Sequence, residues 1–470
     1  MFGKKQRRDA APKKSHVQDM TEGRPLGLIL RFALPLMLGN AFQQCYTLAD
    51  TIIVGQGVGV QALAAVGAAG WFSWLILGII TGFTQGFSIF AAQTFGAKDY
   101  RELNRVVQTS AVLTAGIVVL LVAAAQLLSA PMLRLMQTPE DIMGGALIYL
   151  RITFWGIPLS ALYNLSAAML TALGDSKGPL KAMVIASAIN IGLDMLFVFV
   201  FHWGIAGAAG ATVIAQGFAG VYCALRLRAV EQIKPEKAFW RPEREFSLRL
   251  LKTGLPVSFQ NSIISTGGMV VQSVVNTYGL IFIAGYTATN RLYGLLEIAA
   301  ISFGYAVMTF VGQNIGAKKP ERVRKGVSQG AILAVGVSLV IAAAMLIFGR
   351  AIAGLFVSGT PEEVAATVDV AYSYLTVMSS FLPLLYILHN YRNALLGLGD
   401  TVMPMVSGIA EFAMRVLIAM TLPALFGGEA VFFAETAAWA AAALILFAAY
   451  RVRIRRFEAR VREEALLGRF

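Results

Sequence analysis

Long uncharged apolar stretches are the feature that most limits how this chain can fold. Residues 111–126 and 331–349 contain no charged side chain, and each lies in an apolar run near the roughly 20 residues that cross a bilayer as a helix. Of the 470 residues, 57% are hydrophobic and only 14% are charged. A soluble domain carries roughly 25% charge, so this chain has too few charges to cover a surface that faces water. The sequence therefore predicts an all-α polytopic membrane protein.

The net charge of +13 orients this membrane protein and does not indicate nucleic-acid binding. When the chain is divided into twelve apolar spans, nearly all Lys and Arg residues fall in the two tails and in alternate loops. The opposite loops contain only Arg134 and Arg350 as basic residues, and they carry acids such as Glu140 and Glu362. By the positive-inside rule, this asymmetry places both termini in the cytoplasm of a bacterial inner membrane. The predicted partner is the lipid bilayer, with no nucleic acid.

The chain is also an internal duplication. Three pairs of segments match in the same order, at offsets near 220 residues: Gln93–Glu102 with Gln313–Arg322, Ala172–Pro179 with Gly397–Pro404, and Ala33–Pro35 with Gly254–Pro256. Matched loops on one side of the membrane indicate parallel repeats related by an axis near the membrane normal. We expect twelve transmembrane helices in two six-helix bundles related by pseudo-two-fold symmetry.

The repeats divide the chain into an N-terminal tail (1–24), an N-lobe (25–228), a linker (229–248), a C-lobe (249–455) and a C-terminal tail (456–470). Two such lobes leave a cavity between them, which rocking opens to alternate sides of the membrane. This arrangement favours a transporter. The alternative is a duplicated membrane protein that transports nothing, in which buried charges would lack a purpose.

Two acids lie inside predicted spans of the N-lobe, namely Asp50 in the first span and Asp194 in the fifth. Charges at the bilayer centre are costly, and those that persist face a bundle interior or water. Tyr46 precedes Asp50 by four residues and Asn190 precedes Asp194 by four, so each pair shares a helix face. Thr212 adds a hydroxyl in the sixth span. We expect these side chains to face one N-lobe cavity.

Such oxygen ligands suit Na⁺ or a proton and not a transition metal. Two carboxylates in a dry site repel each other, so at least one is expected to take up a proton near neutral pH. The hypothesis is a coupling site for H⁺ or Na⁺, with Na⁺ held by Asp50, Asn190, Asp194 and Thr212. The alternative is two unrelated structural acids, each hydrogen-bonded locally.

The C-lobe has lost both acids, because the equivalent positions fall near Val271 and at Ala419. It carries four other charges in its spans: Arg291, Glu297, Glu411 and Arg415. Glu411 and Arg415 are four residues apart and are expected to pair, which favours a structural or gating role. For Glu297, the alternatives of attracting a cationic substrate in the cavity and of a structural role are equally balanced.

Taken together, these motifs resemble the multidrug and toxic compound extrusion (MATE) family from about Arg24 to about Arg455. The resemblance includes Tyr46–Gly55, the following Ala62–Gly67, the two Gly-Asp loops and the two Gly-Ala-Lys loops. The DinF-like and MepA-like bacterial branch is the most similar. The NorM-like branch places a Glu on span seven, but around Ile264 this chain has only apolar and small polar residues. A sodium site of that type in the C-lobe is therefore not expected.

The resemblance implies roles for particular residues. The cation-coupling residues would be Asp50, Asn190, Asp194 and Thr212, Tyr46 would occupy the family's tyrosine position, and Pro35 would be the point at which the first span bends. The chain would be a monomeric antiporter that exports small hydrophobic or cationic compounds in exchange for H⁺ or Na⁺, without a cofactor.

Three other functions would require different sequence features. A lipid-linked oligosaccharide flippase of the same superfamily should have a cavity rich in Arg and Lys for the pyrophosphate, and typically extra spans. A channel or a receptor would need neither coupling acids nor alternating access. An enzyme is not expected, because His202 and His389 lack a partner at metal-binding spacing and no nucleophile elbow or phosphate loop is found.

Overall fold

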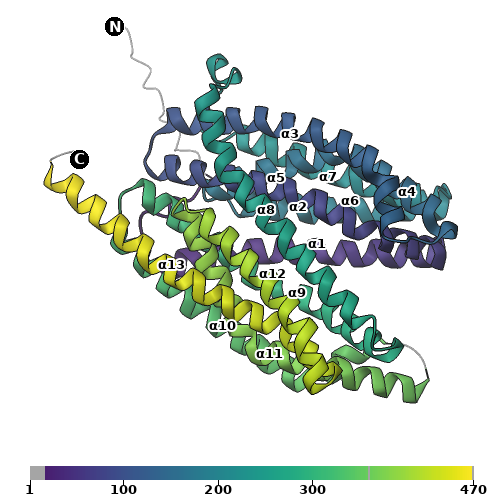
Figure 1. Cartoon of the computed structure of the whole chain (residues 1–470). Coiled ribbons are helices and arrows are strands. Elements are labelled where there is room, and N and C mark those ends of the chain that lie inside the picture. Colours follow the sequence, from purple (N-terminus) through teal and green to yellow (C-terminus); the bar gives the residue numbers. More distant parts are fainter. Residues whose placement is uncertain (1–15, 358–359, 468–470) are drawn as a thin grey trace, which may run out of the picture.

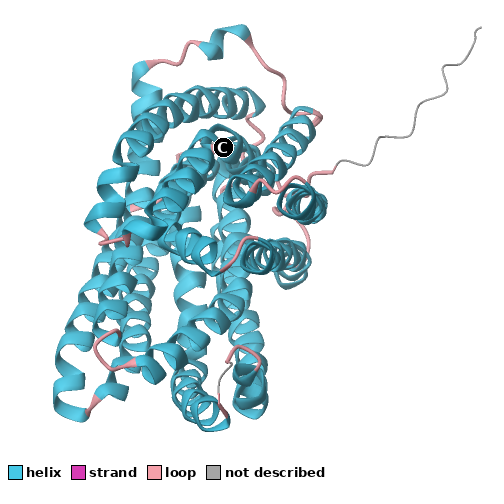
Figure 2. Cartoon of the chain, turned by 90° about the vertical axis from the view of Figure 1, so that its right-hand side faces the viewer, coloured by secondary structure: helices cyan, strands magenta, loops and turns pink. Residues whose placement is uncertain are grey.

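The computed structural model describes residues 16–357 and 360–467, which form thirteen α-helices and contain no strand (Figures 1 and 2). The first half contains α1 (Pro25–Gly57), α2 (Val60–Gly96), α3 (Tyr100–Leu135), α4 (Glu140–Trp155), α5 (Ile157–Ala172), α6 (Lys177–Asp194), the π-helix η1 (Met195–Val200) and α7 (Gly204–Arg228). The second half contains the 3₁₀ turn η2 (Lys237–Trp240), α8 (Arg244–Val275), α9 (Leu280–Gly316), α10 (Pro320–Gly354), α11 (Pro361–Gly397), α12 (Val402–Phe426), the 3₁₀ turn η3 (Gly428–Phe432) and α13 (Phe433–Leu466).

The membrane spans follow from length and hydropathy. Ten of the described helices are long and apolar enough to cross a membrane, and α4 and α5 form an eleventh span that is bent by 48°. The helix α8 is long enough at 32 residues, but Gln260, Asn261 and Ser265 make it more polar. These three residues line a central cavity, so α8 shows polar groups to that cavity instead of to lipid. Counting α8 gives the twelve spans that the sequence predicts.

The helices pack as two lobes with matching internal contacts. In the N-lobe α2 packs on α3 and α5, and α6 packs on α1 and α7; in the C-lobe α9 packs on α10 and α11, and α12 packs on α8 and α13. The lobes meet through α2 with α8, α1 with α9, and α2 with α9. The contacts of the two lobes are not fully symmetric, because Ile29, Phe32 and Leu36 at the start of α1 belong to the hydrophobic core of the C-lobe. The two-lobed all-α fold is thus confirmed.

The duplicated motifs form the same loops in both lobes. Lys98 and Lys318, in the two Gly-Ala-Lys loops, both have left-handed backbones, with φ of 58° and 55°. In the Gly-Asp loops, Asp175 accepts a hydrogen bond from the Gly178 amide and pairs with Arg226 at 2.5 Å. Asp400 likewise accepts one from the Met403 amide and pairs with Arg453 at 2.5 Å. Each acid therefore starts a helix and ties it to the last helix of its own lobe.

The two lobes meet at one end and spread apart toward the other, and the first and last described residues lie at the end where they meet (Figure 1). We call this end the terminus side. The loops after α2, α5, α9 and α11 also lie there, because each of them contacts the N-terminal segment or the opposite lobe: Gly96 against Gln313, Gly174 against Gln18, Gly316 against Gln93, and Gly399 against the Gln93 side chain. The cavity between the lobes is therefore closed on the terminus side.

Candidate functional site

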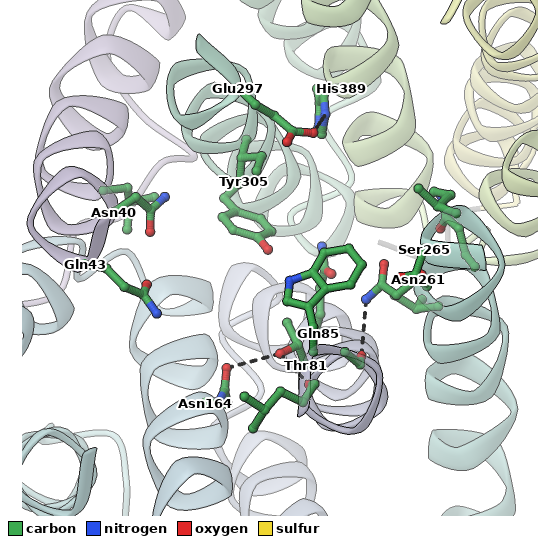
Figure 3. A pocket seen from close by; sticks show the side chains of 18 of the residues that line it. Asn40, Gln43, Thr81, Gln85, Asn164, Asn261, Ser265, Glu297, Tyr305 and His389 are labelled. Carbon is green, nitrogen blue, oxygen red and sulfur yellow. Dashed lines mark hydrogen bonds and ion pairs between the residues drawn. The ribbon is translucent and has the colours of Figure 1, made fainter. Parts of the chain in front are cut away.

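A cavity of about 980 Å³ lies between the lobes and is lined by both of them (Figure 3). The N-lobe contributes Asn40, Gln43, Tyr46, Thr81, Gln85, Asn164, Thr212 and Gln216. The C-lobe contributes Asn261, Ser265, Arg291, Glu297, Tyr305, His389, Arg392, Glu411, Arg415 and Glu435. Apolar side chains such as Trp74, Ile264 and Met308 complete the wall. A cavity of this size and mixed lining suits a drug-sized amphipathic molecule.

The charges of this cavity are on one side. Among the described residues, every charged side chain that lines it comes from the C-lobe, whereas the polar N-lobe lining consists of hydroxyls and amides. Figure 3 shows this contrast, with Asn40, Gln43 and Asn164 facing Glu297 and His389. The N-lobe acids predicted from the sequence are not part of the cavity wall.

Asp50, Asn190 and Asp194 lie behind the N-lobe wall. Asn190 and Asp194 are completely buried and Asp50 is 8% exposed, and none of them lines the cavity. Tyr46 and Thr212 do line it, and each is close to this buried group. The Asn190 amide donates to the Thr212 hydroxyl at 3.4 Å, and Tyr46 lies one turn before Asp50 on α1. The five predicted residues therefore divide into a buried group and its cavity-facing edge.

Several oxygens of the buried group lack a hydrogen-bond partner within the described part of the chain. They are Asp50 Oδ1, Asn190 Oδ1 and both carboxylate oxygens of Asp194. Buried polar atoms are normally satisfied, so a cluster of unsatisfied acceptors needs an explanation. A proton or a hard cation between them would supply one. The described residues bring together no set of three or more His, Cys, Asp and Glu side chains that would hold a resident metal ion.

Three features near this group were not found from the sequence. Gln216 donates a hydrogen bond to the Tyr46 hydroxyl at 3.1 Å, and Tyr149 lies within electrostatic range of both Asp50 and Asp194. In addition, the chain passes into the π-helix η1 directly after Asp194. Such wide turns occur often at functional sites. Gln216 lies four residues after Thr212, a spacing that could have indicated it; Tyr149 and η1 have no comparable signal.

The C-lobe positions that match the two N-lobe acids are apolar. Val271 and Ala419, which match Asp50 and Asp194 in the repeat, are 1% and 2% exposed and belong to the C-lobe hydrophobic core. The helix α12 also continues as a regular α-helix beyond Ala419, with no counterpart of η1. Unsatisfied acids at matched positions thus occur in the N-lobe and not in the C-lobe.

Two of the predicted C-lobe charges, Glu411 and Arg415, belong to a chain of ion pairs along the cavity. Glu411 and Arg415 approach to 3.8 Å, but the stronger contacts of Arg415 are two hydrogen bonds to Glu435, at 2.7 and 2.9 Å. Glu411 itself accepts from Arg392. Glu435 was not predicted from the sequence, although it is a single acid near the start of the apolar stretch 430–449. Glu411 and Glu435 are each paired with an arginine, as buried charges require, whereas Arg392 Nε has no hydrogen-bond partner within the described part of the chain.

The other two predicted C-lobe residues, Arg291 and Glu297, both line the cavity. Glu297 lies 3.5 Å from His389 Nε2, and Figure 3 shows the two side chains facing each other across from Tyr305. His389 is a further cavity residue that sequence reasoning considered only as a metal ligand.

Pro35, the predicted bend, lies inside α1, which runs unbroken from Pro25 to Gly57. Pro256 occupies the matching place in α8. Asp50 lies about 22 Å further along α1 at 1.5 Å per residue.

Two lobes of membrane-spanning helices around a shared cavity define a polytopic membrane transporter. The sequence profile described as MatE matches residues 35–196 and 256–421. The chain therefore belongs to the MatE family of transporters and is not an enzyme.

Individual relatives agree with this assignment. The probable multidrug resistance protein YpnP of Bacillus subtilis is 35% identical over 308 residues, which cover 65% of this chain and 68% of that protein. The multidrug export protein MepA of Staphylococcus aureus is 23% identical over 427 residues, covering 89% and 93%. The structure of a MOP superfamily transporter from Pyrococcus furiosus has the same fold, with a TM-score of 0.88 over 96% of this chain and 100% of that chain, at 24% identity.

Proposed function

We propose that this chain is a secondary antiporter that exports small hydrophobic or cationic amphipathic compounds in exchange for H⁺ or Na⁺. The cavity between the lobes would hold the substrate, and rocking of the lobes would expose it to alternate sides of the membrane. The printed names of YpnP and MepA, a multidrug resistance protein and a multidrug export protein, support this class of substrate.

The observation that carries the coupling mechanism is the buried group behind the N-lobe wall. Asp50 and Asp194 have carboxylate oxygens without a partner, so the group is suited to take up a cation from the cavity through the Tyr46 and Thr212 edge. Entry of H⁺ or Na⁺ neutralises the acids, which removes their mutual repulsion and changes how α1 packs on α6. Bending of α1 at Pro35 would then release the substrate.

The energy available is sufficient for export. One unit of pH gradient supplies about 1.4 kcal/mol per proton, and 100 mV of membrane potential supplies about 2.3 kcal/mol per charge moved. Either contribution supports a roughly tenfold or larger substrate gradient.

Glu297 is the residue we propose for attracting cationic substrates. It is the acid of the cavity wall that is not held by an arginine, since Glu411 and Glu435 are paired with Arg392 and Arg415 within the described chain. The same pairing argues against a pyrophosphate-binding flippase, because two of the three cavity arginines are already neutralised.

We further propose that both termini are cytoplasmic, as the positive-inside pattern predicts, and that the unit is a monomer with the lobe boundaries given above. With this orientation, the closed terminus side is the cytoplasmic side and the cavity opens outward.

Purified protein in liposomes tests this function. A fluorescent lipophilic cation should leave the liposomes when either a pH gradient or a Na⁺ gradient is imposed, and the gradient that drives it identifies the coupling ion. Collapse of that gradient with an ionophore should stop efflux. Efflux that ignores both gradients, or no efflux of any amphipathic substrate, would contradict the proposal.

A further inference from the structure

On the terminus side, the backbones of the two lobes touch directly. A Cβ atom at Gly96 of α2 would lie 1.9 Å from the carbonyl oxygen of Gln313, and one at Gly316 of α9 would lie 1.8 Å from that of Gln93. These distances leave no room for any side chain. The contact is reciprocal, because Gln93 with Gln313 and Gly96 with Gly316 are matched positions of the repeat.

Each of these two glutamines donates a hydrogen bond to a backbone carbonyl of the opposite lobe. The Gln93 amide of the N-lobe donates to the Gly397 carbonyl of the C-lobe at 2.9 Å, and the Gln313 amide of the C-lobe donates to the Ala172 carbonyl of the N-lobe at 2.9 Å. Gly397 and Ala172 are the last residues of α11 and α5. Carbonyls at a helix C-terminus lack an intrahelical donor, so each glutamine satisfies a group that would otherwise need water.

An N-terminal strap, residues Gln18–Gly23, covers one half of this arrangement. The completely buried Met20 donates its amide to Gln313 Oε1 at 2.8 Å, and its carbonyl accepts from Asn314 at 3.1 Å. On the other side of the strap, the backbone of Gln18 lies against Gly174, where a Cβ would be 2.1 Å from the Gln18 oxygen. The strap therefore contacts both lobes, and Gln313 holds the strap as well as the N-lobe.

We propose that Gln93 and Gln313 are the positioning residues that close the terminus side during transport, with the strap strengthening the Gln313 half. The inference rests on the alternating access of the proposed function. When the lobes separate, water can take the place of each glutamine, so these bonds can form and break repeatedly with little net change in free energy. A reversible latch needs this property, which an apolar seal of equal area lacks.

Cysteine accessibility tests the latch without requiring transport. In a background of Cys45→Ser and Cys223→Ser, the reporter Ala168→Cys lies in the cavity wall one turn before Ala172. A membrane-impermeant maleimide is applied from the terminus side. A separate variant, Leu467→Cys, has an exposed cysteine at the end of α13, and its labelling shows that the reagent reaches the terminus side. The readout is the labelling rate of the reporter, so a protein that exports nothing still gives an answer.

Gln93→Ala should raise the reporter's labelling rate about fivefold, the change expected from losing one hydrogen bond. Gln313→Ala should raise it more, because it loses its bonds to both Ala172 and Met20. The matched control is Gln108→Ala, a glutamine that is buried like Gln313 but bonds to Glu236 in the linker, and it should leave the rate unchanged.

Gly316→Ala gives a second test, since its Cβ cannot fit in the closed arrangement and should expose the reporter if the protein folds. Wild-type labelling rates in both glutamine variants would overturn the latch. Equal rates for Gln93→Ala and Gln313→Ala, both raised, would overturn the role of the strap alone.

Discussion

The Tyr46 hydroxyl accepts a hydrogen bond of 3.1 Å from the Gln216 amide at the edge of the cavity, one helical turn before Asp50. Both side chains line the cavity, while Asp50 does not. This pair therefore stands where an ion would pass between the cavity and the buried N-lobe group.

Breaking that bond should slow ion entry without removing the ion site. We expect Tyr46→Phe and Gln216→Ala to lower the rate of gradient-driven efflux several-fold, while the number of ions exchanged per substrate stays the same. Initial rates and ion-to-substrate ratios in liposomes measure the two quantities. Gln85→Ala, which also removes a cavity-lining amide but one that bonds to Met308, serves as the control. A changed ratio in Tyr46→Phe would show that the hydroxyl belongs to the ion site.

Glu297 should lower the KM for cationic substrates and not for neutral ones. We expect Glu297→Gln to raise the KM for a monovalent cationic substrate about tenfold, equivalent to about 1.4 kcal/mol, and to leave an uncharged amphipathic substrate unaffected. His389→Gln keeps a polar group beside Glu297 but cannot carry a positive charge, so it should lower the KM for the cation. Equal effects on charged and neutral substrates would indicate a packing role for Glu297.

Pro35 and its counterpart Pro256 should not be equivalent. Pro35→Ala restores a backbone donor inside α1 and favours a straight helix by as much as about 3 kcal/mol. If bending of α1 releases the substrate, transport should slow while substrate binding remains. Pro256→Ala makes the same change in α8, whose lobe has no coupling acids, and should have a smaller effect. Transport rates of the two variants are measured side by side. Equal rates would contradict a special role for the bend of α1 at Pro35.

The C-lobe ion pairs should matter for stability. Arg415 and Glu435 have side chains only 6% and 12% exposed, so Arg415→Ala leaves a buried carboxylate without its partner. Loss of one member of a buried pair costs about 3–5 kcal/mol, which should lower the Tm in detergent by several degrees. The control is Arg350→Ala, whose pair with Asp369 is more than half exposed and contributes about 1 kcal/mol or less. Similar Tm changes in both variants would contradict this ranking.

The sequence predicts the frame of this protein well, because the signals for it are repeated. Apolar length defines the spans, and matched motifs such as Gly-Ala-Lys predict matched loops, which Lys98 and Lys318 confirm with nearly equal φ values. The loss of both acids in the second half is also visible from the repeat, and Val271 and Ala419 are indeed in an apolar core.

Contacts between distant segments are harder to predict. The closer partner of Arg415 is Glu435 and not Glu411, because α13 comes near α12 only in the folded lobe. Likewise, the placement of Asp50 and Asp194 behind the cavity wall depends on how α1 packs on α6. Helical spacing places residues on a shared face, but it does not say whether that face meets the cavity or the bundle interior.

Coupling of export to an ion through the N-lobe group can be tested by comparing variants of its two acids. Asp50→Asn and Asp194→Asn are each reconstituted in liposomes beside the wild type and beside Asp369→Asn, an exposed acid on α11. Efflux of the fluorescent cation is then recorded under the gradient that drives the wild type. We expect gradient-driven efflux to be lost in Asp50→Asn and in Asp194→Asn while substrate binding persists, and we expect Asp369→Asn to behave as the wild type. Efflux that survives both N-lobe substitutions would contradict ion coupling through this group.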